Sequence, residues 1–373
     1  MSAGRVQIFV YPEELEHVEP ERLAEHLLEL GADAVSLAVS YHRARRILPR
    51  YGRISVLSRR AFYLEPDAAS YGAMAPPRPA APEWPERLLR FRSACAQSGL
   101  AFRAWVVALH DDDLAAAHPD AAATLLDGSP AGHALCPAVP KTVEYAAALV
   151  SDVARQLSPD AVDVEAALYP AWEPSYTLTL SLGPLAESTR RLAGQCFCAS
   201  CRELAGSEAS SLQARVRRAA GPPFSSAAHD DPSLAEVLGA MRSAGAARLT
   251  GAVAEAARAA GTSACFFVSG APEDASVRGV SPESLAAVDD LLFGCGPLRG
   301  SDLLTRFAGL RTLTGRAAAV SMNWVPERAG ELAVDAERVA AAGAAGLALY
   351  NLTLVPDEGL ADFRAAAAAF RAA

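Results

Sequence analysis

The sequence predicts a single (β/α)8 barrel, or TIM barrel, over residues 1–373, and three observations lead to this prediction. Short apolar runs alternate with alanine-rich helical runs about eight times, which is the pattern of parallel strands joined by crossover helices. The segment after the first apolar run reads "YPEELEHVEP" and lacks the glycine-rich turn of a dinucleotide-binding open sheet. A chain of 373 residues, 51% of them hydrophobic, suffices for a large barrel core.

The strands and helices of this barrel are predicted from the same alternation. Several helical runs begin with Pro, Ser or Asp and end with Gly, the residues preferred where helices start and stop. In chain order, the predicted strands cover residues 5–11, 33–41, 102–110, 160–169, 263–270, 289–296, 317–324 and 345–354. The predicted helices cover residues 20–31, 83–99, 142–157, 233–261, 301–313, 329–343 and 359–373.

Two connections are much longer than ordinary loops. They comprise residues 43–82 after the second predicted strand and residues 169–231 after the fourth. Loops of this length in a compact domain are usually functional or contain structure of their own. Both leave the C-terminal ends of strands, where TIM-barrel enzymes carry their active sites.

The composition excludes several classes of partner. The formal net charge of −9 is spread along the chain without a basic stripe, so we expect neither nucleic acid nor an anionic membrane surface as a partner. The N-terminus lacks the apolar segment of a secretory signal, and no run approaches ~18 apolar residues. We therefore expect a cytoplasmic protein, either a monomer or a homo-oligomer, without an organic cofactor.

Three of the seven cysteines lie within six residues, in "GQCFCASCREL". Cys196, Cys198 and Cys201 offer three thiolates, and Cys136 is the best candidate for a fourth because it also follows the C-terminal end of a strand. Four sulfurs would complete the tetrahedral coordination of a structural zinc ion, with no open position for water. The alternative is a group of thiols packed at the start of a helix. We favour zinc, which would hold the fourth loop against the third.

The cysteine pattern also carries a resemblance to a known family. A Cys-Pro pair before the fourth strand, a glutamate at the end of that strand, and Cys-x-Cys-x2-Cys at a helix start resemble the β-galactosidases of glycoside hydrolase clan A. In that family the four cysteines bind zinc and the glutamate is the general acid/base, which implies these roles for the four cysteines here and for Glu165. The stretches "VSLAVSYHRARRILPR" and "WVVALHDDDLAAAHPDA" also resemble a broader group of bacterial glycosidase-like barrels. The resemblance covers roughly the first 210 residues.

Glu165 is the first candidate for a catalytic acid. It stands in the apolar run "DAVDVEAALYP", and a carboxyl at the end of this strand would face the barrel mouth. Partial desolvation there raises the pKa of a carboxyl and favours the acid role. The alternative is a structural ion pair with an arginine. Asp163 lies two residues earlier, and we expect it to be deeper and structural.

Glycoside hydrolysis also needs a second carboxylate, which retaining enzymes hold only ~5–5.5 Å from the first. Clan A enzymes place it at the end of the seventh strand, where this sequence has Asn323 instead. Glu327, beyond a proline, and Glu173, in the fourth loop, are the candidates. The acidic run 111–113 is a further source, or else a charge cluster at a helix N-terminus.

Other side chains at predicted strand ends have the chemistry of sugar recognition. Aromatic rings stack on the C–H faces of sugars, whereas asparagine and arginine bind hydroxyl groups. The candidate substrate-binding residues are Tyr41, His42, Arg43, Trp105, His110, Trp172, Asn323, Trp324 and Asn351.

These features favour a glycoside hydrolase-like enzyme acting on a glycoside or another polyhydroxylated small molecule. One alternative is a lyase or isomerase on the same barrel, in which Glu165 and either His42 or His110 move protons. A second alternative is a carbohydrate-binding barrel without catalysis.

Overall fold

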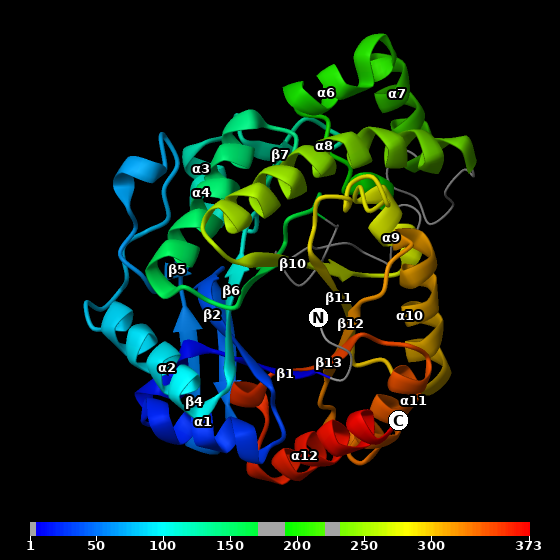
Figure 1. Cartoon of the computed structure of the whole chain (residues 1–373). Coiled ribbons are helices and arrows are strands. Elements are labelled where there is room, and N and C mark those ends of the chain that lie inside the picture. Colours follow the sequence, from blue (N-terminus) through cyan, green and yellow to red (C-terminus); the bar gives the residue numbers. More distant parts are fainter. Residues whose placement is uncertain (1–4, 171–190, 221–231) are drawn as a thin grey trace.

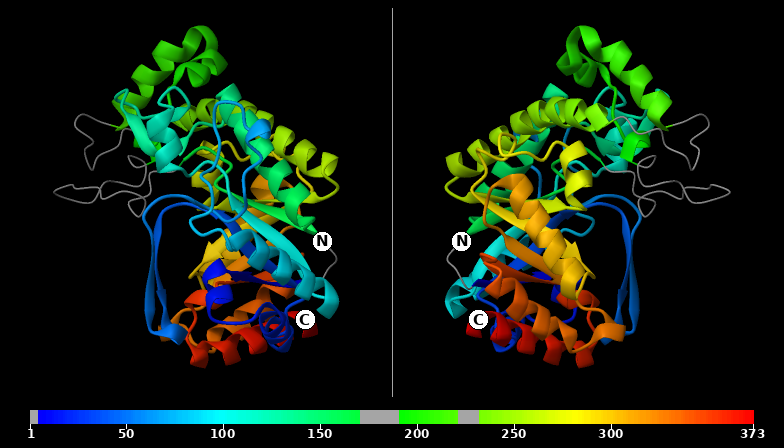
Figure 2. Two further views of the ribbon diagram at one scale, coloured as in Figure 1. Left: turned by 90° about the vertical axis from the view of Figure 1, so that its left-hand side faces the viewer. Right: turned by 90° about the vertical axis from the view of Figure 1, so that its right-hand side faces the viewer.

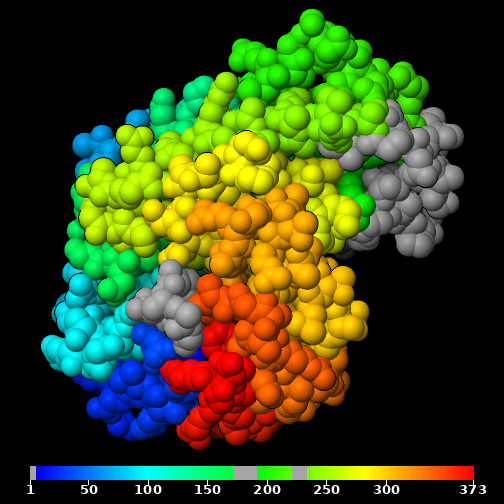
Figure 3. Space-filling model, turned by 45° about the vertical axis from the view of Figure 1, so that its right-hand side comes forward, coloured from blue at the N-terminus to red at the C-terminus, as the bar shows by residue number. Residues whose placement is uncertain are grey.

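Eight parallel strands close into a barrel in the computed structural model, which describes residues 5–170, 191–220 and 232–373 (Figure 1). β1 (Arg5–Val10) pairs with both β2 (Ala34–Tyr41) and β13 (Gly346–Tyr350), so the barrel has no open side. Figure 3 shows the blue N-terminal and red C-terminal segments side by side on the surface, and a hydrogen bond from Arg364 to the Glu29 carbonyl joins them. The predicted TIM barrel is confirmed. The remaining barrel strands are β6 (Ala101–Val107), β9 (Ala161–Glu165), β10 (Ser263–Ser269), β11 (Asp290–Gly296) and β12 (Ala319–Asn323).

The fourth predicted strand, residues 160–169, is longer than β9, which ends at Glu165. Ala166 adopts a left-handed backbone with φ of 53°, and the chain leaves the barrel at this point. The apolar residues that follow are buried in the loop instead of the sheet. The apolar composition of residues 166–169 is compatible with a buried strand and with a buried loop. The predicted strand was therefore too long at its C-terminal end.

The predicted helices surround the barrel, and each packs an apolar stripe against the strands (Figure 1). Most have proline in their first turn, where the missing N–H has no intrahelical partner to lose. They are α1 (Pro20–Glu29), α2 (Trp84–Ser98), α4 (Pro140–Leu157), α8 (Pro232–Ala259), α10 (Gly300–Thr314), α11 (Glu331–Ala341) and α12 (Asp357–Ala372). The short helix α9 (Pro272–Val277) was not predicted. No helix in these ranges is both long and apolar enough to cross a bilayer.

The long connections contain structure of their own. After β2, a hairpin of β3 (Ala44–Leu48) and β4 (Arg53–Leu57) runs along one side of the barrel (Figure 2), and β5 (Ala61–Phe62) pairs antiparallel with β2. After β9, the described residues form two helices that extend beyond the barrel (Figure 1). These are α6 (Ala199–Ala205) and α7 (Ala209–Ala220).

The connection after β6 is also elaborate, which the sequence pattern did not reveal. It forms the short helix α3 (Asp112–Ala117) and the antiparallel pair β7 (Ala122–Thr124) and β8 (Pro130–Leu135). Their residues are mostly alanine and other small residues without a clear period, so a short helix and two short strands leave little signal.

Buried ion pairs anchor the hairpin to the barrel. Arg46 of β3 pairs with Glu13, whose Oε1 also accepts a hydrogen bond of 2.7 Å from Ser55 of β4. Beside them, Glu14 accepts hydrogen bonds from Arg50 at 2.5 Å and from the Tyr51 hydroxyl at 2.6 Å. These contacts therefore hold the hairpin in a fixed position beside the barrel.

A polar network fills the lower barrel interior below the predicted site. Asp163 is fully buried and accepts hydrogen bonds from Gln7 at 2.8 Å and from Ser36 at 2.6 Å. It also pairs with the buried guanidinium of Arg103. The expectation of a deep, structural Asp163 is confirmed.

Candidate active site and candidate metal centre

Strand register determines which side chains point into the barrel mouth. In a parallel pair, residues in register share one face of the sheet, and the next residue along faces the other way. Glu165 is in register with Val107, which belongs to the interior cluster of the barrel. Asn323 is in register with Tyr350, which packs on the same cluster. Glu165, Asn323 and Tyr350 therefore share the inner face at the C-terminal ends of their strands.

Glu165 lies in an environment suited to a proton donor. Its side chain is partly buried, and the indole Nε1 of Trp105 donates a hydrogen bond of 2.8 Å to its Oε2. Burial raises the pKa of Glu165 to about 7, and the Trp105 hydrogen bond and the positive charge of Arg278 act in the opposite direction. Near neutral pH this carboxyl is therefore present in both its neutral and its ionised form.

Aromatic side chains from several strands surround this carboxyl. The ring of Trp105 contacts Phe9 and Tyr41 at centroid distances of 5.1 Å each, and stacks on Tyr11 at 5.4 Å. The Tyr11 hydroxyl donates a hydrogen bond of 3.0 Å to that of Tyr41 and lies 2.5 Å from that of Tyr350. The guanidinium of Arg46 lies over the Tyr11 ring at 3.8 Å, so the hairpin covers this side of the cluster.

Tyr11 and Tyr350 were not among the site residues predicted from the sequence, although each stands at the end of an apolar run, as Tyr41 does. Of the predicted rings that belong to this cluster, Trp105 is fully buried and Tyr41 is 6% exposed. Trp105 thus contacts the Glu165 carboxyl and its aromatic neighbours, and offers no open face to a sugar in this structure. Its position favours a role in orienting Glu165.

The histidines predicted at the strand ends form a stack. His42 packs on Tyr41 at a centroid distance of 4.3 Å and on His110 at 4.0 Å, and His110 contacts His133 edge to face at 5.5 Å. Burial lowers the pKa of His42 to about 4 and that of His110 to about 2, where neighbouring histidines and arginines contribute. Both rings are therefore neutral, and weak bases, at neutral pH.

The acidic run after β6 has structural partners. Asp111 caps α3 by accepting a hydrogen bond of 2.9 Å from the Leu114 N–H, and it pairs with the buried Arg60 at 3.0 Å. Asp112 pairs with Arg43 at 3.1 Å. Of the two interpretations of this run, these contacts support the helix N-terminal one. Arg43, which was predicted to bind substrate, therefore forms an ion pair with Asp112 in this structure.

Two predicted substrate-binding residues make hydrogen bonds within the protein. The Trp324 indole donates a hydrogen bond of 2.8 Å to Asp362 of α12, and its ring packs against Gly359. Asn351 is 1% exposed, and its Oδ1 accepts a hydrogen bond of 3.0 Å from the Thr353 N–H. Trp324 comes one position after the inward-facing Asn323, and the alternation of side chains explains its direction.

The described residues do not identify the second catalytic carboxylate. Glu327 lies in the short 3-10 helix Pro326–Arg328 after β12, and its side chain is exposed. Glu173 and Trp172 lie outside the described residues. Among the described ion pairs, Glu165 takes part in none, which removes the structural alternative of an arginine-paired Glu165 for this part of the chain.

The four predicted cysteines converge on one buried point. The sulfurs of Cys136, Cys196, Cys198 and Cys201 all lie within 4.8 Å of one another, and Cys136 lies 3.5 Å from both Cys198 and Cys201. Zinc–sulfur bonds of about 2.3 Å give a tetrahedron whose edges are about 3.8 Å. The cluster therefore fits a metal ion with four thiolate ligands.

The surroundings of the cluster suit negatively charged thiolates. The backbone N–H of Thr124 donates to the Cys196 sulfur at 3.2 Å, and the fully buried Arg242 donates to the Cys201 sulfur at 3.2 Å. Such outer contacts orient metal ligands and balance their charge. The cluster also joins the loop after β6 to the loop after β9, as predicted.

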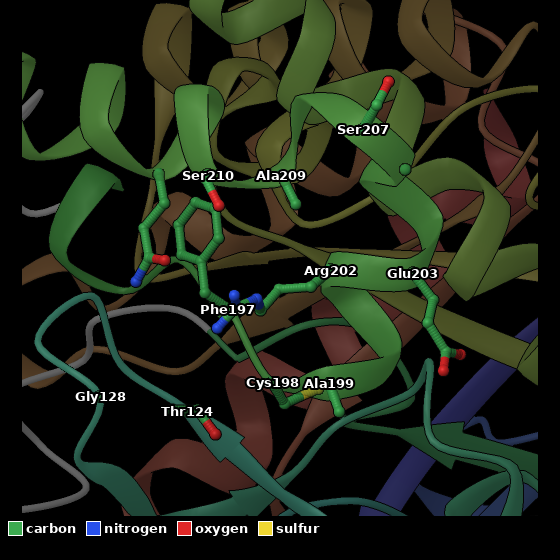
Figure 4. A pocket seen from close by; sticks show the side chains of 12 residues that line it. Thr124, Gly128, Phe197, Cys198, Ala199, Arg202, Glu203, Ser207, Ala209 and Ser210 are labelled. Carbon is green, nitrogen blue, oxygen red and sulfur yellow. The ribbon is translucent and has the colours of Figure 1, made fainter.

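An open groove of about 760 Å³ lies beside the cluster (Figure 4). Phe197 and Cys198 line one part of it, and Thr124 and Ser210 face it from β7 and α7. Arg202 and other polar side chains of α6 complete its wall. It belongs to the helical extension after β9 and is separate from the inner face of the barrel.

No protein-family model and no curated protein matches this sequence. Solved structures share its fold. The glycoside hydrolase domain of PgaB (BpsB) from Bordetella bronchiseptica aligns with a TM-score of 0.57 and 14% identity, over 98% of this chain and 97% of that one. A β-galactosidase from the psychrophilic Marinomonas ef1 aligns with a TM-score of 0.56 and 12% identity, over 98% and 59% of the two chains.

The α-L-fucosidase isoenzyme 2 from Paenibacillus thiaminolyticus aligns with a TM-score of 0.55 and 14% identity, over 99% of this chain. This chain thus spans 49% of the fucosidase and 59% of the β-galactosidase. The chain is similar to glycoside hydrolases in its barrel fold. Identities this low establish the fold alone.

Proposed function

We propose that this protein is a glycoside hydrolase-like enzyme that acts on a glycoside or another polyhydroxylated small molecule, with Glu165 as general acid/base. The observation that carries the proposal is the partly buried Glu165 carboxyl at the end of β9, whose pKa is raised to about 7. A glycosidase acid must hold its proton near neutral pH and release it to the leaving oxygen. The hydrogen bond from Trp105 orients this carboxyl for the transfer.

The second carboxylate of the proposed reaction is Glu173 or Glu327. Glu327 follows β12, the strand after which clan A enzymes carry this group, but it must come inward from an exposed turn. Asn323 stands on the inner face instead, where an amide can bind a sugar hydroxyl. We assign Asn323, together with Tyr41, His42, Arg43 and His110, to substrate binding.

We further propose that the four-cysteine cluster holds a structural zinc ion. Four buried thiolates at near-tetrahedral spacing leave no open position for substrate, so the ion would fix the two loops and take no part in hydrolysis.

A lyase or isomerase using His42 or His110 receives less support. A general base works best when its pKa lies near the working pH. Burial lowers the pKa of both rings to about 4 or below.

The decisive experiment measures turnover of a panel of nitrophenyl glycosides by the full chain and its Glu→Gln variants. We expect Glu165→Gln to lose at least about 100-fold in kcat, and either Glu173→Gln or Glu327→Gln to lose a comparable factor. Glu337→Gln, on the exposed face of α11, is the matched control and should retain full activity. A Glu165→Gln variant that turns over glycosides at the wild-type rate contradicts the proposal. Unchanged ligand affinity in a chain that never shows turnover identifies a carbohydrate-binding barrel instead.

A further inference from the structure

Residues 166–169 connect the Glu165 carboxyl to the four-cysteine cluster. They run from the end of β9 to Tyr169, which is 2% exposed. The Tyr169 hydroxyl lies 3.8 Å from the Cys201 sulfur, and the guanidinium of Arg242 lies 4.5 Å from the centre of its ring. The Tyr169 side chain is therefore part of the packing around the cluster.

The position of this side chain depends on a glycine of α8. A Cβ atom at Gly245 would lie 2.1 Å from the Tyr169 hydroxyl oxygen, far inside van der Waals contact. One turn earlier on the same helix, Arg242 donates its hydrogen bond to the Cys201 sulfur. Helix α8, the Tyr169 ring and the cysteine cluster thus fix one another.

The backbone of Tyr169 holds the cation that acts on Glu165. Its N–H donates to the Arg278 carbonyl at 3.3 Å, and Arg278 Nε donates to the Tyr169 carbonyl at 2.9 Å. Arg278 Nη1 also donates to the carbonyl of Ser269, at the end of β10, at 3.3 Å. The positive charge of Arg278 lowers the pKa of Glu165 and opposes the effect of burial.

We propose that Tyr169 is a positioning residue that couples the four-cysteine cluster to Glu165, so that a metal ion in the cluster fixes Arg278 relative to this carboxyl. The significance of the coupling for catalysis rests on the proposed function. The coupling itself rests on the contacts of Tyr169, which unite the cluster, α8 and Arg278. A loosened cluster would allow the Tyr169 ring to move. Because the Tyr169 backbone holds Arg278, the Arg278 guanidinium would move as well.

Other groups face Glu165 from the neighbouring strands. Trp105 donates to it from β6, and the charge of Glu165 also acts on the tyrosine hydroxyls at the ends of β1, β2 and β13. Within the described contacts, none of these groups bonds to the cysteine cluster. Among the described groups that act on Glu165, Arg278 is the one whose contacts lead to the cluster, through Tyr169.

The test uses the metal-loaded full chain and needs no substrate. Protonation of Glu165 changes the environment of the Trp105 indole, so tryptophan fluorescence followed against pH reports the carboxyl, and a Glu165→Gln variant identifies its part of the signal. We expect Gly245→Ala to raise the midpoint by about half a pH unit, because the opposite charge is held less closely. We also expect it to lower the affinity for Zn²⁺ in chelator competition about tenfold.

Gly251→Ala is the matched control, because it lies on the same helix and a Cβ there meets nothing within 4 Å. It should leave both the midpoint and the metal affinity unchanged. Equal midpoints for Gly245→Ala and Gly251→Ala overturn the proposal.

Should Gly245→Ala fail to fold, two further measurements decide. Removing the metal from the unmutated chain should raise the midpoint in the same direction, and so should Arg278→Met. An unchanged midpoint in either measurement overturns the coupling. A chain that shows the coupling but hydrolyses no glycoside contradicts the proposed function alone.

Discussion

The indole nitrogen of Trp105 lies 2.8 Å from the Oε2 atom of Glu165 and donates a hydrogen bond to it. This bond joins a fully buried ring on β6 to a partly buried carboxyl on β9. It stabilises the ionised carboxylate against the effect of burial, so the pKa of Glu165 depends on both.

Replacing Trp105 with phenylalanine should raise the pKa of Glu165 above its value of about 7, because the hydrogen bond to the carboxylate is lost. The basic limb of the pH profile of kcat should move to higher pH, and kcat should fall because the acid is less well oriented. Trp84→Phe, in a buried ring of α2 that does not bond to Glu165, is the control and should leave the limb in place. Superimposable profiles for Trp105→Phe and wild type would exclude the orienting role.

The same pKa shift predicts how stability depends on pH. The folded-state pKa of about 7 exceeds the ordinary value of 4.5, so the folded protein holds a proton that the unfolded chain releases between these values. Relative to Glu165→Gln, the wild type should therefore lose stability as pH rises from about 4.5 to 7, by at most about 3 kcal/mol. Urea unfolding at pH 5 and pH 8 measures this difference, and Glu337→Gln, which keeps Glu165, should follow the wild type at both pH values.

Mutating Cys136 to serine should remove the bound metal. Elemental analysis of the wild type should give about one zinc ion per chain, whereas the variant should contain little and melt at a lower temperature. Cys295→Ser is the matched control, since this cysteine is also buried but lies outside the cluster. A full zinc content in Cys136→Ser would show that the cluster is not the metal site.

Breaking the buried ion pair beneath the hairpin should destabilise the protein. Arg46→Leu leaves the Glu13 carboxylate buried without its partner, which costs about 3–5 kcal/mol. Arg45→Leu removes a charge from the exposed face of the same strand and should change the free energy of unfolding by less than about 0.5 kcal/mol. Similar urea midpoints for the two variants would show that the hairpin is not anchored by this pair.

Substitutions at Asn323 and Trp324 should have different effects, the first on substrate binding and the second on stability. Asn323→Ala should raise KM with little change in melting temperature, because its amide faces the mouth. Trp324→Phe should lower the free energy of unfolding by about 1 kcal/mol through the lost hydrogen bond to Asp362. The kinetic constants of Trp324→Phe should stay at wild-type values. The reverse assignment of effects would contradict the inward and outward directions given to these side chains.

Apolar runs separated by amphipathic helices predicted the barrel because both signals are local. Strands such as residues 263–270 and helices such as residues 142–157 are encoded by a few neighbouring residues. The cysteine spacing likewise predicted a cluster, since three sulfurs within six residues already lie close together. Only the fourth sulfur, from Cys136, had to arrive from another loop.

The sequence by itself therefore determined the class of fold, the position of Glu165 at a strand end and the cysteines that meet. The tertiary structure alone decided that Trp105 donates a hydrogen bond to Glu165, that Tyr11 and Tyr350 join Tyr41, that Trp324 bonds to α12, and that Asn351 caps a short helix. The physical reason is the separation along the chain over which each signal acts. Periodicity and composition act over a few residues, whereas the direction of a side chain at the mouth depends on where each strand ends and on its register with strands far away in the chain.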